Sequence, residues 1–158
     1  MRDLIVRRIQ PADAARAKHL ILAGLQERWG TLDPTRNRDL DDIVSSYQDG
    51  VFLVAFSGSD LIGTGALIRE NEATGRIVRM WVDQGNRRKG VGTAILGQLL
   101  RIARELRYGK VVLETEPDWD DAVSFYKGHG FEPVGIIRGN LQFDMQLRMP
   151  AANEIRSG

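Results

Sequence analysis

The chain has 158 residues, of which 42% are hydrophobic and 27% are charged, and its formal net charge is +1 at pH 7. This size and balance are typical of one folded domain with a single core, and the near-zero charge gives no global attraction to nucleic acids or membranes. The sequence has no apolar run of the ~20 residues that a membrane-spanning helix needs and no signal-peptide pattern at its start, so we expect a cytoplasmic protein.

Hydrophobic periodicity and turn residues predict a mixed α/β domain. Seven strands are expected at residues 4–9, 51–56, 61–68, 76–82, 110–113, 131–137 and 141–147. Four helices are expected at residues 11–28, 40–47, 90–108 and 120–127. Pro11 opens the first helix and Asp39 is the expected cap of the second. The third helix carries one apolar face, formed by Val91, Ile95, Leu99, Ile102 and Leu106.

No repeat, low-complexity segment or flexible linker interrupts this order of elements. We therefore expect one domain over residues 1–149, followed by a flexible tail at residues 150–158. The sequence has no cysteine and only two histidines, His19 and His129, which excludes disulfides, thiolate zinc sites and a cysteine nucleophile. Asp118, Asp120 and Asp121 are expected to provide charge at a helix N-terminus. We expect no bound metal.

The most informative stretch lies between the strand at residues 76–82 and the long third helix. It is basic and rich in glycine: Arg87-Arg88-Lys89-Gly90-Val91-Gly92. The free N–H groups and the positive dipole end of a helix attract an anion. Gly90 and Gly92 allow the backbone to approach oxygen atoms closely, and the three basic side chains place charge where a diphosphate needs it. The pattern predicts a phosphate-binding loop.

Two other nucleotide motifs do not fit this loop. A P-loop requires lysine after its second glycine, but Val91 follows Gly90. A dinucleotide fingerprint requires a third glycine where Ile95 stands, and it opens a βαβ unit rather than following a meander. A basic turn that only connects strand and helix is the remaining structural alternative.

The pattern Arg87-x-x-Gly90-x-Gly92 resembles the acetyl-CoA loop of the GNAT superfamily of N-acetyltransferases. A later segment is similar to the family's Asn-x-x-Ala-x-x-Phe-Tyr-x-x-x-Gly-Phe motif, through Ala122, Phe125, Tyr126, Gly130 and Phe131. Trp119 replaces the motif's asparagine. The resemblance covers about residues 4–147. It implies a GNAT-like fold, with a central, mostly antiparallel sheet of about seven strands that is splayed between the fourth and fifth strands and flanked by about four helices.

The resemblance also implies a set of residues that bind acetyl-CoA. These are Met80, Trp81, Val82, Arg87, Arg88, Lys89, Gly90, Val91, Gly92, Thr93 and Trp119. In the family the loop amides bind the diphosphate, and the preceding strand offers backbone groups to the pantetheine arm. The indole of Trp119 can pack against that arm but cannot replace the bonding of an amide. A backbone N–H of Trp81 or Val82 is the expected donor to the oxyanion.

The resemblance assigns Tyr126 as the general acid for the departing thiolate. A phenol has an ordinary pKa of about 10 and can donate this proton; the structural alternative is a tyrosine that anchors its helix. The general base stays open: Glu114, at the end of its predicted strand, can act through water or be simply solvated, and Glu27 and Glu116 are weaker candidates. Without a cysteine, direct transfer in a ternary complex is the mechanism that remains.

In the family the first helices wall the acceptor site, which implies that Glu27, Arg28 and Trp29 bind the substrate. The implied activity is transfer of an acetyl group from acetyl-CoA to a primary amine of a small molecule, an amino acid or a protein. A homodimer is common in the family. The alternatives are a non-catalytic acyl-CoA-binding or sensing domain, and a nucleic-acid-binding domain, against which the charge balance and the lack of aromatic residues among the basic ones argue.

Overall fold

The computed structural model describes residues 3–33 and 35–147 of the chain, and the tail predicted at residues 150–158 lies outside this part. The described residues form seven strands: β1 (Leu4–Arg8), β2 (Val51–Ser57), β3 (Asp60–Asn71), β4 (Thr74–Val82), β5 (Lys110–Thr115), β6 (Glu132–Ile137) and β7 (Asn140–Gln146). They form four α-helices: α1 (Ala14–Trp29), α2 (Ile43–Ser46), α3 (Val91–Glu105) and α4 (Asp120–Gly128). Short 3₁₀ helices precede α1 and α2 and follow β4: η1 (Pro11–Asp13), η2 (Arg38–Asp42) and η3 (Gln84–Asn86).

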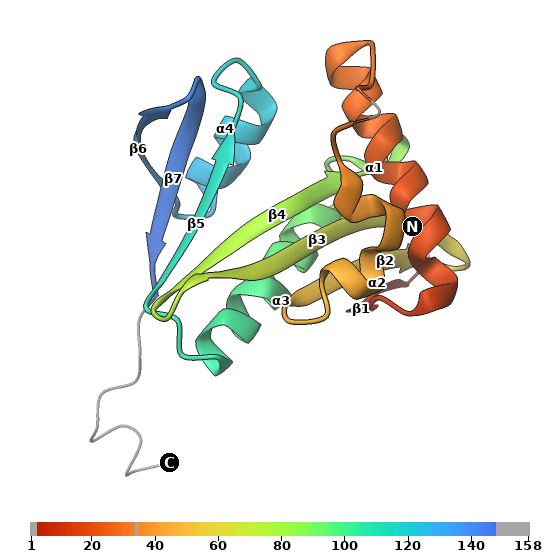
Figure 1. The fold of residues 1–158 in the computed structure, drawn as a ribbon, viewed down its shortest axis with the longest axis horizontal. Helices are drawn as coiled ribbons and strands as arrows, with labels where there is room; N and C mark the ends of the chain where they lie inside the picture. Colours follow the sequence, from red (N-terminus) through yellow and green to blue (C-terminus); the bar gives the residue numbers. More distant parts are fainter. Residues whose placement is uncertain (1–2, 34, 148–158) are drawn as a thin grey trace. The chain divides into compact units, whose positions relative to one another are not determined.

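The strands follow the order β1-β2-β3-β4-β5-β7-β6 in one sheet (Figure 1). The pairs β1–β2, β2–β3, β5–β7 and β6–β7 are antiparallel. β4 and β5 are parallel, and their register joins Thr74–Arg76 with Lys110–Val112. The predicted fold class, a mixed α/β domain with a mostly antiparallel seven-stranded sheet and four helices, is confirmed.

Two compact units can be distinguished in the described chain. The N-terminal unit comprises residues 3–33, 35–68 and 77–99, and the C-terminal unit comprises residues 69–76 and 100–147. Helix α3 contributes to both. The expectation of a single domain over residues 1–149 stays a prediction. Among the helices of the described residues, none combines the length and apolar character that crossing a membrane requires.

Two local predictions about helices are wrong. Asp39 does not cap the second helix; Asp42 does, because its side chain accepts a hydrogen bond from the Ser45 amide at 3.2 Å. The third helix ends at Glu105 rather than at residue 108, and Arg107 has a φ of +64° just beyond it. Leu106, expected on the buried face, is therefore past the helix end and 48% exposed.

Helices cover both faces of the sheet in the N-terminal unit. Side chains of β2 that point to one face, Phe52, Val54 and Phe56, form a buried cluster with apolar residues of α1 and α2. The opposite face of β3 carries Gly63 and Gly65, where an added Cβ would lie within 3.0 Å of side chains of α3. Because these positions lack a Cβ, α3 packs closely on the strand. This packing determines where the N-terminus of α3 lies.

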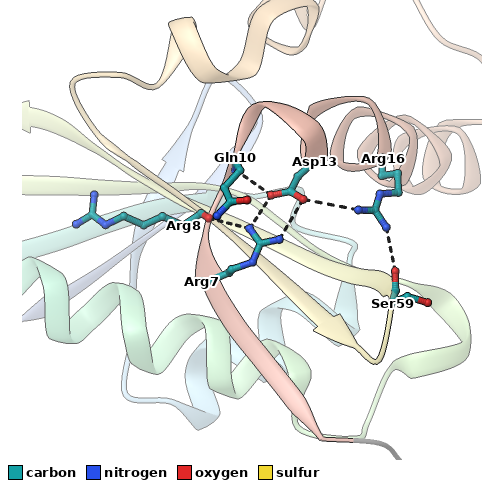
Figure 2. A network of polar contacts seen from close by, with 6 residues as sticks. All are labelled: Arg7, Arg8, Gln10, Asp13, Arg16 and Ser59. Carbon is teal, nitrogen blue, oxygen red and sulfur yellow. Dashed lines mark hydrogen bonds and ion pairs between the residues drawn. The ribbon is translucent and has the colours of Figure 1, made fainter.

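The start of α1 is fixed by the buried carboxylate of Asp13 (Figure 2). The Arg7 guanidinium donates to both Asp13 oxygens, at 2.7 and 3.1 Å, and the Gln10 amide donates to one of them at 2.8 Å. Arg16 lies 3.7 Å from the same carboxylate and donates to the Ser59 carbonyl at 2.9 Å. The hydrogen bond from Arg7 lowers the pKa of Asp13 and outweighs the opposing effect of burial. These contacts of Asp13 and Arg16 therefore link β1, α1 and the β2–β3 turn.

The C-terminal unit has an aromatic core. Tyr126 of α4 packs its ring against Phe131 and Phe143, with centroids 5.7 and 6.0 Å away, and all three are buried. The last strand in the sheet order, β6, exposes every one of its residues. The apolar side chains of Val134 and Ile136 are 58% and 64% exposed.

Candidate functional site

The predicted phosphate loop connects β4 to α3 within the N-terminal unit. The Asp83 amide closes the end of β4 with a hydrogen bond of 2.8 Å to the Ile62 carbonyl. Arg88 and Gly90 then have left-handed backbones, with φ of +62° and +84°. The first bond of α3 runs from the Ala94 amide to the Gly90 carbonyl, at 3.0 Å. The amides of Val91 and Gly92 lie in the first turn of α3, where N–H groups point out of the helix end, so the loop can present donors to an anion.

The three basic side chains of the loop have different environments. Arg88 and Lys89 are exposed. Arg87 is half-buried, and its guanidinium donates to both carboxylate oxygens of Glu27 on α1, at 2.9 and 3.2 Å. Its Nε donates to the Val82 carbonyl at 3.3 Å. The structure therefore brings together two residues for which the sequence suggested separate roles, Arg87 with the cofactor and Glu27 with the acceptor.

Met80, Trp81 and Val82, the strand residues expected along the pantetheine arm, are half-buried at the end of β4. The indole of Trp81 lies directly against Gly24 of α1, where an added Cβ would come within 2.6 Å of a ring carbon. A side chain at position 24 would displace the indole. The last two turns of α1 therefore position Trp81.

Arg79 precedes these residues in β4 and has a φ of +58°. Its guanidinium donates to the two oxygens of Asp39 at 3.0 and 2.6 Å, and Tyr47 donates to the same carboxylate at 2.6 Å. The buried Thr64 hydroxyl donates to the Arg79 carbonyl at 2.7 Å. Burial raises the pKa of Asp39, but the hydrogen bonds from Arg79 and Tyr47 outweigh it and hold that pKa below its ordinary value.

This arrangement, defined here as the Arg79 clamp, combines a left-handed residue with a half-buried ion pair. Burial and the neighbouring carboxylate of Asp39 raise the pKa of Tyr47 to about 12, so its phenol stays a proton donor to Asp39. Left-handed backbone at a residue other than glycine is unfavourable and persists only where surrounding contacts hold it. The clamp therefore determines the backbone direction immediately before Met80.

The two predicted catalytic residues lie in the C-terminal unit. Tyr126 is buried in the aromatic core, and burial raises the pKa of its phenol above the ordinary value. Glu114 lies inside β5, is exposed, and accepts a hydrogen bond of 2.8 Å from Gln142 of β7. Trp119 is the residue before α4 and is half-buried. Asp120 and Asp121 lie in the first turn of α4 as expected.

A family model described as the acetyltransferase (GNAT) family matches residues 15–131, more than half of the chain. The chain belongs to the GNAT acetyltransferase family. This finding confirms the resemblance to the GNAT superfamily that the sequence indicated.

Curated relatives of this GNAT chain include N-acetyltransferase 8F1 of Rattus norvegicus, which is 35% identical over 104 residues, 61% of this chain and 47% of that protein. N-acetyltransferase 8 of Homo sapiens is 29% identical over 112 residues, 66% of this chain and 49% of that protein. The chain thus spans about half the length of the curated relatives it matches.

Solved structures of acetyltransferases share the fold. An acetyltransferase of the GNAT family from Staphylococcus aureus Mu50 has a TM-score of 0.84 at 20% identity, covering 92% of this chain and 100% of that one. The PaiA N-acetyltransferase of Thermoplasma acidophilum, solved in complex with coenzyme A, has a TM-score of 0.80 at 18% identity, covering 92% and 99%. These likenesses show that the fold is shared over almost the whole chain.

The residues expected at the acceptor wall of this GNAT chain lie at the end of α1. Glu27 is bonded to Arg87, Arg28 is half-buried, and Trp29, the last residue of the helix, is 48% exposed. A cavity of about 740 Å³ runs along the neighbouring face of α1. Its wall includes His19, Glu27, Asp60, Asp83 and Arg87. Of the three wall residues predicted from the sequence, Glu27 alone lines this cavity.

Sequence reasoning missed the Arg79 clamp and the role of two glycines. Arg79 and Asp39 are 40 positions apart, so no local pattern connects them. Gly63 and Gly65 do carry a usable signal, because alternate glycines on one face of a strand indicate that another element approaches closely.

Proposed function

We propose that this GNAT chain is an acetyl-CoA-dependent N-acetyltransferase that transfers an acetyl group directly to a primary amine in a ternary complex. The observation that carries the proposal is the loop before α3, with the first-turn amides of a 15-residue helix next to the left-handed residues Arg88 and Gly90. The PaiA N-acetyltransferase, which shares the fold, was solved in complex with coenzyme A. A loop of this kind offers the N–H donors and positive charge that bind the diphosphate of coenzyme A.

The loop residues fit a diphosphate on three counts. A Cβ at Gly90 would meet no atom within 4 Å, so the space before the helix is open. Arg88 and Lys89 are exposed on the loop and add positive charge. The dipole of α3 adds partial positive charge at the same end. Met80, Trp81 and Val82, on the strand that leads into the loop, would hold the pantetheine arm through their backbone groups.

Acetyl-CoA supplies the activated thioester when it is bound, and the chain's own residues handle charge and protons. A backbone N–H of Trp81 or Val82 would donate to the negative charge that develops on the thioester oxygen during attack by the amine. Tyr126 would supply the proton that the departing thiolate needs, since a phenol is protonated at neutral pH and burial raises its pKa further. Glu114 accepts the proton that the amine loses, through water.

A non-catalytic acyl-CoA-binding domain is the second candidate. The observation that favours it is the burial of Tyr126 among aromatic rings, the environment of a tyrosine that anchors its helix. Release of free thiol from acetyl-CoA in the presence of an amine distinguishes the two candidates. The chain has no cysteine, so any thiol detected in solution comes from the cofactor.

We also propose that the chain forms a homodimer through β6. The strand exposes Val134, Ile136 and Ile137 at 58%, 64% and 60%. Antiparallel pairing of two copies about Gly135 would place Glu132 of each copy opposite Arg138 of the other, joining opposite charges. Val134→Lys is expected to convert a dimer to a monomer in sedimentation analysis. A monomeric wild-type chain at micromolar concentration would contradict the proposal.

The first experiment is a thermal shift of the purified chain with acetyl-CoA, coenzyme A, ATP and NAD in parallel. A ligand that binds the native state but not the unfolded chain raises the melting temperature, and the shift grows with the ratio of ligand concentration to dissociation constant. We expect stabilisation by the two coenzyme A species and none by ATP or NAD. Stabilisation by acetyl-CoA then leads to a screen of amines by thiol release. A larger shift with ATP or NAD would overturn the proposal.

A further inference from the structure

The last two turns of α1 contact both segments that the proposed function assigns to acetyl-CoA. Gly24 lies against the indole of Trp81 on β4. Glu27, three positions further along the same helix, forms the bidentate pair with Arg87 of the loop. Residues three apart lie on one face of a helix. One face of α1 therefore supports the strand and the loop together, within the N-terminal unit.

The observed hydrogen bonds of the Arg87 side chain all join it to α1 or to the end of β4. Both terminal nitrogens donate to Glu27, at 2.9 and 3.2 Å, and Nε donates to the Val82 carbonyl at 3.3 Å. The Arg87 and Glu27 side chains are 31% and 37% exposed, so the pair is partly withdrawn from water. A guanidinium that pairs with a carboxylate in this bidentate way is held in one orientation. The exposed Arg88 and Lys89 have no such restriction from this pair.

We propose that Glu27 is a positioning residue of the loop. It holds Arg87 against α1, so that Arg87 shapes the backbone of the loop, and the direct charge toward the diphosphate comes from Arg88, Lys89 and the amides of α3. This inference rests on the proposed function, because it concerns how the chain holds acetyl-CoA. It gives Glu27 a role in cofactor binding rather than in binding the acceptor.

The test uses the fact that the two roles of Arg87 predict opposite effects of Glu27→Gln. If Arg87 binds the diphosphate itself, removing the carboxylate frees a cation for the phosphate, and acetyl-CoA binds more tightly. If Arg87 positions the loop, the same change loosens the loop and weakens binding. We expect the dissociation constant for acetyl-CoA, measured by titration calorimetry, to rise about three- to tenfold, the effect of weakening a partly exposed bidentate pair. An unchanged or lower constant overturns the proposal.

Asp41→Asn is the matched control. Asp41 pairs with Lys18 of α1 at 3.0 Å, so this variant also removes one carboxylate that holds α1 and changes the net charge by the same amount. The pair does not involve the loop. We expect Asp41→Asn to bind acetyl-CoA as the wild-type chain does. A loss equal to that of Glu27→Gln would show that any weakened anchor of α1 has this effect, which overturns the specific role of Glu27.

Exchange of the two charges gives a second, independent test. The double variant Glu27→Arg with Arg87→Glu keeps an ion pair but places a carboxylate in the loop. We expect its affinity for acetyl-CoA to recover to within about threefold of the wild-type value. Comparison with the two single variants gives the interaction free energy between positions 27 and 87. Binding by the double variant as weak as that of Arg87→Glu alone would show that the guanidinium itself contacts the phosphate.

A readout without cofactor separates this inference from the proposed function. Arg88 and Lys89 are exposed trypsin sites within the loop. We expect trypsin to cut the free Glu27→Gln variant at these bonds several times faster than the free wild-type chain or Asp41→Asn, as followed by mass spectrometry. Equal cutting rates overturn the positioning role even if acetyl-CoA binds. If trypsin cuts Glu27→Gln faster but the wild-type chain does not bind acetyl-CoA, the proposed function is overturned. The positioning role of Glu27 in the loop then still holds.

Discussion

The left-handed backbone of Arg79 allows a direct test of strain in β4. Arg79 has a φ of +58°, a conformation that costs a residue with a Cβ about 1–2 kcal/mol relative to its ordinary backbone. Arg79→Ala keeps that strain, and Arg79→Gly removes it. Both variants lose the same bonds to Asp39, so a comparison between them isolates the backbone effect.

The expected difference follows from two opposing contributions. Glycine relieves the left-handed strain of about 1–2 kcal/mol in the folded chain. It also gives the unfolded chain more freedom, which lowers stability relative to alanine by about 0.4–1 kcal/mol. The Gly variant should therefore be more stable than the Ala variant by about 1 kcal/mol, equivalent to about 2–4 °C in melting temperature for a chain of this size. Both should be less stable than the wild-type chain by about 1.5–3 kcal/mol, because Asp39 loses a charged partner.

Arg76 provides the matched control, since it is an arginine of the same strand and is not among the residues with positive φ. Arg76→Gly should be less stable than Arg76→Ala by about 0.5–1 kcal/mol, the usual cost of glycine inside a strand. Urea denaturation of the four variants measures both differences. If Arg79→Gly is also less stable than Arg79→Ala, the backbone strain is absent and the role given to the Arg79 clamp is wrong.

Three further predictions concern the loop, the acid and the start of α1. Gly92→Asp should weaken acetyl-CoA binding at least tenfold while keeping or raising the melting temperature of the free chain, because a carboxylate at a helix N-terminus stabilises the helix but repels a diphosphate; unchanged affinity by calorimetry would remove the loop from the cofactor site. Tyr126→Phe should lower turnover much more than affinity for acetyl-CoA, and equal turnover across the pH range would exclude Tyr126 as the acid. The pKa of Asp13 is lowered in the folded chain, so its contribution to stability is present above its unfolded pKa of about 4 and is lost as pH falls below that value. Asp13→Asn should therefore be less stable than the wild-type chain at pH 7, with a smaller deficit at pH 3.5 in urea denaturation; a deficit that is equal at both pH values would contradict the charge argument.

The sequence predicted those features of the chain that depend on neighbouring residues. The apolar stripe of α3 was predicted because Val91, Ile95 and Leu99 recur at helical spacing, and all three are buried. The stripe was continued one residue too far, to Leu106, because periodicity alone does not show where a helix stops. The loop motif was visible for the same reason, since its glycines and basic residues are adjacent in the chain.

Features that join distant parts of the chain were not predictable in this way. Asp39 was expected to cap a nearby helix, a local interaction, but its carboxylate binds Arg79 and Tyr47 instead. The sequence suggests different roles for Glu27 and Arg87, because only the fold brings residues 60 positions apart together. A side chain's partner depends on packing, and packing is not contained in a periodic pattern.

The position of the turn before α3, which we propose binds the diphosphate, depends on residues that are not part of the motif. Gly63 and Gly65 let α3 lie close to β3, which sets the helix N-terminus from one side. Glu27 holds the preceding loop through Arg87 from the other side. Amide donors contribute strongly to binding only when their direction matches the charge they meet. A chain with the same six loop residues but bulky side chains at positions 63 and 65 would therefore keep the motif and displace the site. Membership of the family is shown by the matching family model, whereas the affinity for acetyl-CoA that we propose depends on how β3 and α1 hold the loop.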